Sequence, residues 1–331
     1  MPVKPTKIKG VRDITSNIIT SPTGRKIVQG SKAIYLPGFS GLSLYDVVPA
    51  FFDQLRKTSI RERASGISFN IVMAIPPTLI FIFTLLPYFP ISDAFVNQLF
   101  RLIRDIVPGE KNNAVIMEFL TDFLHRQRTG LLSFGLIIAI FFSSNAIMGI
   151  LRTFDKNYPG FLRRKGWKRR KVALKLTMIS YLLLFLCVFI LAAQVSVLEW
   201  LGVKSEMVRF VLKNFRWLLL FLLTFFIISF IYKHGPAVTE KWPLLTPGSV
   251  LATTFMIVAT ALFTFWINTF GGYNRVYGPI SIIFVLMSLI YINSFACLMG
   301  FELNVTLTEL RAKQDDAAAA TQQLPMPHKT G

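Results

Sequence analysis

A long uncharged stretch followed at once by a dense basic run constrains this chain more than any other feature. No residue from Gly130 to Leu151 carries a charge. At the rise of an α-helix, about 22 residues span roughly 33 Å, which is enough to cross a hydrocarbon core of about 30 Å. The stretch therefore predicts a transmembrane helix.

The basic run after this helix predicts its orientation. It consists of Arg152, Lys156, Arg163, Arg164, Lys165, Lys168, Arg169, Arg170 and Lys171. Lys and Arg close to the end of a span are retained on the cytoplasmic side, so the run is a predicted cytoplasmic loop and the helix runs from outside to inside. Basic residues at this position attract anionic lipid head groups. We predict such contacts for Arg163, Arg164, Lys165, Lys168, Arg169, Arg170 and Lys171.

Composition agrees with a membrane protein. Of the 331 residues, 53% are hydrophobic and 16% are charged, and the mean hydropathy is +0.53, more apolar than one soluble core requires. The net charge of +19 raises nucleic acid as an alternative partner. The charges cluster beside apolar spans, however, and no basic helix or aromatic pattern of a nucleic-acid module occurs. The predicted partner is the lipid bilayer, and nucleic acid is not expected.

Five further apolar stretches complete the predicted bundle. The six predicted spans are Ile67–Phe89, Gly130–Leu151, Val172–Val197, Phe215–Tyr232, Gly248–Phe270 and Gly278–Leu303. The segments assigned to the inside contain more than twice as many Lys and Arg residues as those assigned to the outside, which favours two cytoplasmic termini. The predicted fold is all-α, a polytopic membrane bundle with six transmembrane helices and short amphipathic helices, in a bacterial inner membrane.

Three domains follow from this pattern. Residues 1–41 form a basic and largely irregular cytoplasmic arm, residues 42–310 form the six-span membrane domain, and residues 311–331 form a disordered cytoplasmic tail. Apolar residues at helical spacing from Leu42 to Arg63 predict an amphipathic helix, lying either in the membrane interface or on the inner face of the bundle. Residues 90–129 carry two more apolar stripes, which fit either a lid or a cap over the outer end.

The first span carries two consecutive prolines near its middle. Pro76 and Pro77 each remove a backbone donor and clash with the preceding turn, so we expect the helix to bend or break there. Ser68 and Asn70 precede the prolines and could satisfy freed backbone groups. Broken spans hold substrate in many transporters, and a purely structural kink is the commoner alternative.

Uncharged polar residues recur at matching positions of spans two and six. An offset of 148 residues aligns Asn145 with Asn293, and both are expected at equal depth on the inner side of the midplane. Gly149 and Arg152 share the face of Asn145, and Gly300 shares that of Asn293. Buried amides and small residues promote close helix contact. We therefore expect the two faces to meet. A structural contact between the helices is the favoured interpretation, and a polar path or gate is the alternative.

The spans also contain two carboxylates and two cysteines, for which we predict minor roles. Glu302 and Asp155 lie near the cytoplasmic ends of spans six and two, where either can pair with Arg152 or the basic loop. A proton-coupled role of Glu302 is the less favoured hypothesis. Cys187 and Cys297 lie inside spans, so they are predicted to be packing residues and not a disulfide.

Three blocks of sequence resemble one family. They read RERASGISFNIVMAIPPTLIFIF, GLLSFGLIIAIFFSSNAIMGILRTFDKNY and YGPISIIFVLMSLIYINSFACLMGFELN. In this order they resemble the YihY/BrkB family of bacterial inner-membrane proteins, over about residues 45–310. The resemblance implies a six-span helical membrane protein, carried under the label ribonuclease BN and linked by name to a virulence factor. It supplies no agreed catalytic residues.

A metal-dependent nuclease would need groups of ligand residues that this sequence does not provide. Metal-dependent RNA hydrolysis needs clustered His, Asp or Glu ligands. The three histidines, His125, His234 and His328, are assigned to the outside, an inner loop and the tail, so they are not expected to form one site. No paired-carboxylate motif or phosphate-binding glycine loop occurs. We therefore predict that the chain is not an enzyme and uses no metal or cofactor.

These observations leave two functions from different classes. The first is a transporter or channel-like permease for a small solute or ion. The alternative is a membrane scaffold or envelope-assembly factor that binds lipid or a partner through its basic loop. A ribonuclease is the least favoured reading, and association into a homo-oligomer stays open.

Overall fold

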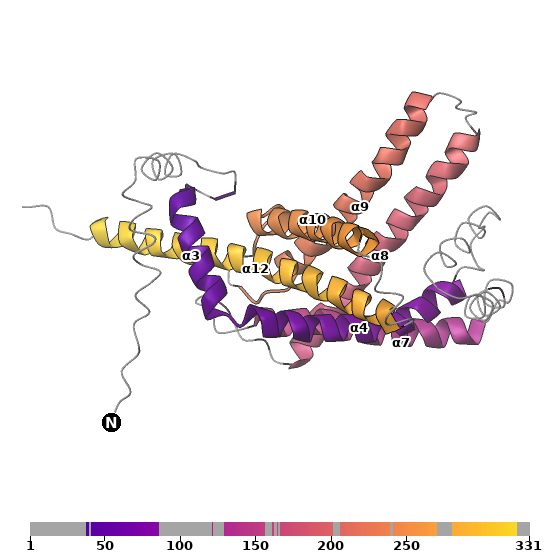
Figure 1. Cartoon of the computed structure of the whole chain (residues 1–331). Coiled ribbons are helices and arrows are strands. Elements are labelled where there is room, and N and C mark those ends of the chain that lie inside the picture. Colours follow the sequence, from indigo (N-terminus) through magenta and orange to yellow (C-terminus); the bar gives the residue numbers. More distant parts are fainter. Residues whose placement is uncertain are drawn as a thin grey trace, which may run out of the picture. The chain divides into compact units, whose positions relative to one another are not determined.

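The computed structural model describes residues 38–39, 41–85, 121, 129–155, 161, 164, 166–200, 206–238, 241–269 and 280–322. Nearly all of them are helical (Figure 1). The helices are α3 (Leu44–Lys57), α4 (Ile60–Leu85), α7 (Thr129–Phe154), α8 (Gly166–Trp200), α9 (Glu206–His234), α10 (Pro247–Thr269) and α12 (Ile280–Gln322). Nearly all of the predicted basic arm of residues 1–41 and of the predicted outer connection of residues 90–129 lie outside the described residues.

The predicted all-α membrane fold is confirmed. Four helices contain stretches long and apolar enough to cross a membrane, namely Ile60–Ile82, Leu132–Phe154, Pro247–Ile267 and Ile283–Asp316. They correspond to predicted spans one, two, five and six. Helix α9 contains a shorter apolar stretch, Leu218–His234, and α8 covers predicted span three. The number of six spans therefore stays a prediction.

The chain divides into two compact units. The larger unit comprises Ser59–Phe301, and the smaller comprises the chain up to Thr58 together with Glu302 onward. Helix α12 contributes to both. It continues to Gln322, so the prediction of a disordered tail from residue 311 is wrong for the part up to that residue.

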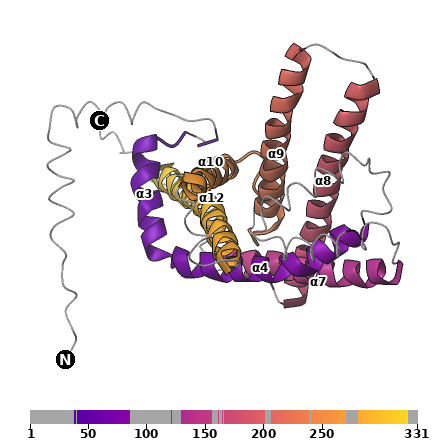
Figure 2. The same cartoon turned by 45° about the vertical axis from the view of Figure 1, so that its right-hand side comes forward.

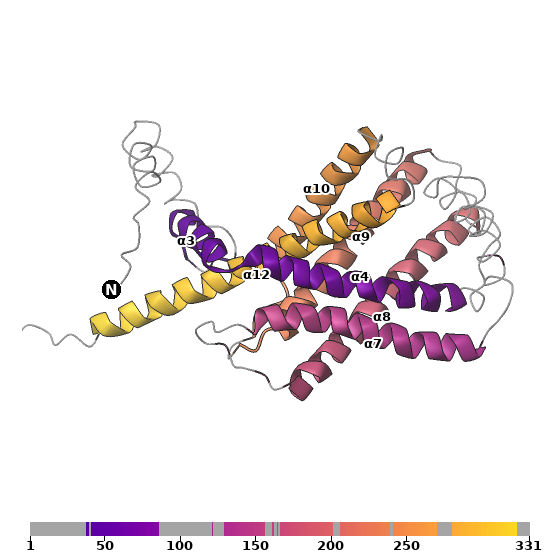
Figure 3. The same ribbon diagram turned by 60° about the horizontal axis from the view of Figure 1, so that its bottom comes forward.

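In the larger unit, α4 and α7 form a close antiparallel pair (Figures 1 and 3). Gly149, near the end of α7, packs on Asn70, and Gly135, near its start, packs on Phe81. A methyl group added to Gly149 would lie 3.0 Å from the amide nitrogen of Asn70. Small residues on α7 therefore allow the two helices to approach closely, as is usual in membrane bundles.

The remaining helices of the larger unit pack in sequence. Helix α8 packs on α7, α9 packs on α8, and α10 packs on α9. Figure 2 shows α8 and α9 running side by side toward their connection. Each helix thus contacts its predecessor, an arrangement that short connections favour in helical bundles.

An aromatic cluster joins the C-terminal ends of α7 and α9 to the middle of α12. The rings of Phe154 and Phe301 stack with their centroids 3.8 Å apart, and Tyr232 lies edge-on to both. Trp242 and Phe161 approach Phe301 from the adjoining connections. Phe154, Tyr232 and Phe301 are fully buried, so this cluster belongs to the buried core of the larger unit.

The predicted amphipathic helix Leu42–Arg63 is in fact interrupted. Helix α3 begins after Ser43, whose hydroxyl oxygen accepts a hydrogen bond from the backbone N–H of Asp46, and it ends at Thr58, which is extended. Arg63 already belongs to α4. In α3, Val47 is buried whereas Phe52 is 54% exposed, so its apolar residues are divided between buried and exposed positions.

Helix α4 also differs from prediction. It begins at Ile60, seven residues before the predicted start of the span, and it continues through Pro76 and Pro77 to Leu85. Figures 1 and 2 show that its ribbon changes direction along the way. The two prolines therefore do not break the helix. The hydroxyl of Thr78 donates to the carbonyl of Ala74 at 2.7 Å, a side-chain hydrogen bond across the turn that contains the two prolines.

Candidate functional site

Three hydroxyl groups from three helices meet directly after the two prolines. Thr78 of α4 lies 3.2 Å from the hydroxyl of Ser143 on α7 and 3.4 Å from that of Tyr181 on α8. Ser143 and Tyr181 are 2.8 Å apart. We call Thr78, Ser143 and Tyr181 the hydroxyl cluster. Each hydroxyl can donate and accept, so the cluster can satisfy itself or exchange partners with a polar solute.

The residues predicted to precede the proline bend are bonded within their own helix. The hydroxyl of Ser68 donates to the carbonyl of Ser65 at 2.9 Å, and the amide of Asn70 donates to the carbonyl of Gly66 at 2.7 Å. The amide of Asn70 also packs against Gly149. Two of the predicted site residues, Asn70 and Gly149, are thereby brought together at the contact of α4 with α7.

Asn145 has a partner that the sequence pattern did not indicate. Arg170, near the start of α8, donates a hydrogen bond of 2.5 Å to the side-chain oxygen of Asn145. The same guanidinium lies 4.8 Å from the ring centroid of Phe141, one turn away from Asn145 on α7. A cation over an aromatic face is attracted by the ring quadrupole. The first turns of α8 are thus bonded to the middle of α7.

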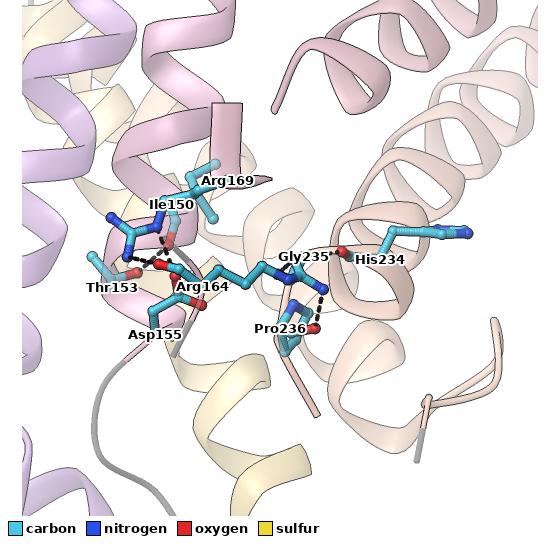
Figure 4. A network of polar contacts seen from close by, with 8 residues as sticks. All are labelled: Ile150, Thr153, Asp155, Arg164, Arg169, His234, Gly235 and Pro236. Carbon is cyan, nitrogen blue, oxygen red and sulfur yellow. Dashed lines mark hydrogen bonds and ion pairs between the residues drawn. The ribbon is translucent and has the colours of Figure 1, made fainter. Parts of the chain in front are cut away.

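Another arginine of the basic run closes the end of α9 (Figure 4). One terminal nitrogen of Arg164 donates to the carbonyls of His234 and Gly235, at 3.2 and 2.7 Å, and the other donates to that of Pro236 at 3.0 Å. Carbonyls at a helix C-terminus lack partners within the helix, so a cationic donor there is favourable. Burial lowers the pKa of Arg164, and the Asp155 carboxylate acts in the opposite direction.

A buried ion pair continues this network. Nε of Arg169 lies 2.6 Å from a carboxylate oxygen of Asp155, and the two side chains are 19% and 2% exposed. A terminal nitrogen of Arg169 also reaches the backbone carbonyl of Arg164 at 3.4 Å (Figure 4). On α7, the carbonyl of Thr153 accepts a hydrogen bond of 2.9 Å from Arg63 of α4. Arginine side chains therefore join α4, α7, α8 and α9 at one end of the larger unit.

The seven predicted lipid contacts consequently fall into different groups. Arg164, Arg169 and Arg170 are bonded within the protein, contrary to a role confined to the lipid surface. Lys168 and Lys171 are exposed. Arg163 and Lys165 lie outside the described residues. The predicted loop is also shorter than expected, because α8 begins at Gly166 and includes the last four basic residues of the run.

The matching polar residues of spans two and six have separate partners. The amide nitrogen of Asn293 donates to the hydroxyl of Thr260 on α10 at 3.1 Å and to the carbonyl of Leu289 at 2.9 Å. Asn145 is bonded to Arg170 instead. Arg152, on the predicted face of Asn145, is exposed. The two asparagines are therefore not brought together, although α7 and α12 do meet at Phe154 and Phe301.

Gly300 and Glu302 occupy buried positions at the predicted cytoplasmic end of span six. A methyl group on Gly300 would overlap the carbonyl of Gly248 and the side chain of Ala252, so α10 and α12 approach closely there. In the smaller unit, the fully buried Glu302 accepts a hydrogen bond of 3.2 Å from the amide of Gln54 on α3. Glu302 thus links α12 to α3.

Sequence reasoning missed the hydroxyl cluster and the partners of the arginines. Single hydroxyl residues within apolar spans carry no periodic signal, and Thr78, Ser143 and Tyr181 come from three helices. The one usable sign was the position of Thr78 directly after Pro76 and Pro77. Hydropathy also treats all basic residues alike, so it cannot separate Arg164 from Lys168.

The comparisons with known proteins agree on one family. The family model described as virulence factor BrkB matches residues 51–324. The chain is 27% identical to the ribonuclease-like protein YfkH of Bacillus subtilis over 261 residues, covering 77% of this chain and 93% of that protein. It is 21% identical to a UPF0761 membrane protein of Haemophilus influenzae over 272 residues, covering 81% and 97%. A UPF0761 membrane protein of Tolumonas auensis is 25% identical over 252 residues, covering 74% and 80%. No solved structure matches.

Proposed function

Because the chain belongs to the virulence factor BrkB family of membrane proteins, we propose that it is a permease, a transporter or channel-like protein for a small solute or ion. In this proposal it lies in a bacterial inner membrane with both termini in the cytoplasm. The observation that carries the proposal is the hydroxyl cluster of Thr78, Ser143 and Tyr181, where α4, α7 and α8 meet.

The position of this cluster supports a path for a polar solute. Thr78 and Ser143 lie within the apolar stretches Ile60–Ile82 and Leu132–Phe154. Polar groups at membrane depth are costly and usually face the bundle interior or a water-filled cavity. Pro76 and Pro77 cannot donate backbone hydrogen bonds, so carbonyls of the preceding turn are available as further acceptors close by. Solute hydroxyls or an ion could exchange with these groups.

The proposal is tested by flux into proteoliposomes. We would reconstitute the full chain and measure the uptake of glycerol, potassium, chloride and phosphate in separate assays. For at least one solute, uptake should exceed that of protein-free vesicles. It should fall at least about fivefold in Thr78→Val or Tyr181→Phe, equivalent to about 1 kcal/mol for one lost hydrogen bond.

A matched control separates this effect from general damage to the membrane helices. Thr224 lies in the apolar part of α9, and its hydroxyl donates to the carbonyl of Leu220 in the same helix. Thr224→Val should leave uptake unchanged. Uptake equal to that of protein-free vesicles for all four solutes would refute the proposal. Asn145→Leu and Asn293→Leu extend the test. If the solute path includes the two amides, uptake should fall in both variants.

A second function, the scaffold that binds lipid, is favoured by a specific surface. Lys168, Lys171 and Lys175 are exposed on α8 at intervals of three and four residues, so they form one stripe. The stripe continues into Met178, Leu182 and Leu186, which are 42%, 69% and 52% exposed. A change from lysine to apolar residues along one exposed face fits the boundary between head groups and hydrocarbon.

The scaffold would depend on these lysines and not on the hydroxyl cluster. We would measure retention of phosphatidylglycerol and phosphatidylcholine by the purified chain with native mass spectrometry. The variant Lys168→Gln, Lys171→Gln and Lys175→Gln should lose the preference for phosphatidylglycerol by about 100-fold, at about 1 kcal/mol for each lysine. An unchanged preference would exclude this surface as a lipid site.

A further inference from the structure

Arg170 differs from the other arginines of the basic run in the kind of partner it has. Arg164 is bonded to carbonyls at a helix end and Arg169 to a carboxylate. Arg170 is bonded to the neutral amide of Asn145 and lies over the ring of Phe141. Among the described residues, no carboxylate balances the charge of this guanidinium.

The guanidinium lies beside the apolar part of α7. Asn145 precedes Arg152 by seven residues, or roughly 10 Å along the helix axis, and Phe141 precedes it by eleven residues, or roughly 16 Å. Both belong to the stretch Leu132–Phe154, which is apolar enough to span a membrane. Ionisable side chains against membrane-spanning segments usually pair with one another or mark ion or substrate pathways.

The contacts of Arg170 with the described residues leave most of its hydrogen-bonding capacity for a ligand. A guanidinium has five N–H donors in one plane, and the bond to Asn145 uses one. The planar fork suits bidentate binding of a carboxylate or phosphate. Arg170 is partly exposed, and Phe141 beside it is 51% exposed, so a ligand can approach from that side.

We propose that Arg170, positioned by Asn145 and Phe141, binds an oxyanion at the contact of α7 with α8. The ligand class is a singly or doubly charged carboxylate or phosphate, supplied either as a free small anion or as the head group of an anionic lipid. This inference rests on the proposed permease function, because it names the class of solute that the permease would bind. It assigns Arg170 as the binding group and Asn145 as the positioning residue.

The experiment measures anion binding directly. The purified full chain in an uncharged detergent is titrated with inorganic phosphate, with acetate and with short-chain phosphatidylglycerol, and the shift in melting temperature is recorded. Glucose and short-chain phosphatidylcholine serve as neutral probes. At least one anion should raise the melting temperature in a saturable way, whereas the neutral probes should not. The anion that acts identifies the source of the ligand.

Two variants separate the charge from the structural contact. Arg170→Gln keeps a side-chain donor for Asn145 but removes the charge and the planar fork. It should therefore weaken anion binding at least about tenfold while the protein remains folded, because charge-assisted hydrogen bonds are stronger than neutral ones. Lys241→Gln removes one charge from an exposed position of the same unit and should change the affinity less than twofold. Arg170→Lys should restore part of the affinity.

The outcomes for this site and for transport differ. Saturable anion binding that Arg170→Gln abolishes, without flux of any solute, would support the site and refute the permease. Flux of glycerol without any anion binding that depends on Arg170 would support the permease and overturn the anion site. Equal anion affinity in Arg170→Gln and the unmodified chain, or no binding of the three anions, would also overturn it.

Discussion

The arginines and the lysines of one basic segment behave differently, although hydropathy and charge counting treat them alike. Arg164, Arg169 and Arg170 turn into the protein and bond to α7 and α9, whereas Lys168 and Lys171 remain exposed. A guanidinium is planar, weakly hydrated and offers several directed donors, while an ammonium is a compact and strongly hydrated charge. The same cationic segment therefore joins helices through its arginines and leaves the charges of Lys168 and Lys171 exposed.

The largest expected effect on stability comes from Arg164→Ala. This change leaves the carbonyls of His234, Gly235 and Pro236 without their donor and should lower the free energy of unfolding by about 3 kcal/mol, since each orphaned buried acceptor costs about 1 kcal/mol or more. The measurement is denaturant unfolding in detergent micelles.

The control for Arg164→Ala is the same substitution at the exposed Lys168. It should change the free energy of unfolding by less than about 0.5 kcal/mol. Equal losses in the two variants would mean that the distinction between bonded arginines and exposed lysines has no energetic basis.

Asp155→Asn tests the buried partner of the arginines and should have the next largest effect. It leaves Arg169 without its carboxylate and should lower the free energy of unfolding by about 2 kcal/mol, below the usual 3 to 5 for a broken buried pair, because Arg169 is partly exposed. Exposed Asp53 provides the control, and Asp53→Asn should be close to neutral. A loss that disappears in 1 M salt would indicate a screened surface pair instead of a buried one.

Arg164→Lys asks whether charge alone is enough. A lysine keeps the charge but places its donors on a single nitrogen, so it cannot reach three successive carbonyls as the guanidinium does. We expect a loss of about 1.5 kcal/mol in the same unfolding measurement, between Arg164→Ala and the unmodified chain. Full stability in the lysine variant would show that only charge at the end of α9 matters.

The same comparison explains how far the sequence could predict the structure. Hydropathy located the apolar helices because crossing a bilayer requires long uncharged stretches. Gly149 was predicted to lie in a close contact with span six, but it packs on Asn70 of α4 instead. Side-chain partners depend on where helices cross, which no local pattern contains, so Arg170 with Asn145 could not be derived. The C-terminal helix was a different kind of error, because the alanine run in residues 317–320 has high helix propensity and was assigned to a disordered tail.

The smallest effect on stability, but a measurable effect on lipid binding, is expected for Lys171→Gln. Lys171 is exposed on α8, so its removal should change the free energy of unfolding by less than about 0.5 kcal/mol. Its attraction to an anionic surface is worth about 1 kcal/mol, and the affinity for phosphatidylglycerol should fall about fivefold. That difference should shrink as the salt concentration rises, because exposed charges are screened. A loss of stability comparable to that of Arg164→Ala would place Lys171 among the residues that hold the helices together and remove the distinction between the two kinds of basic residue.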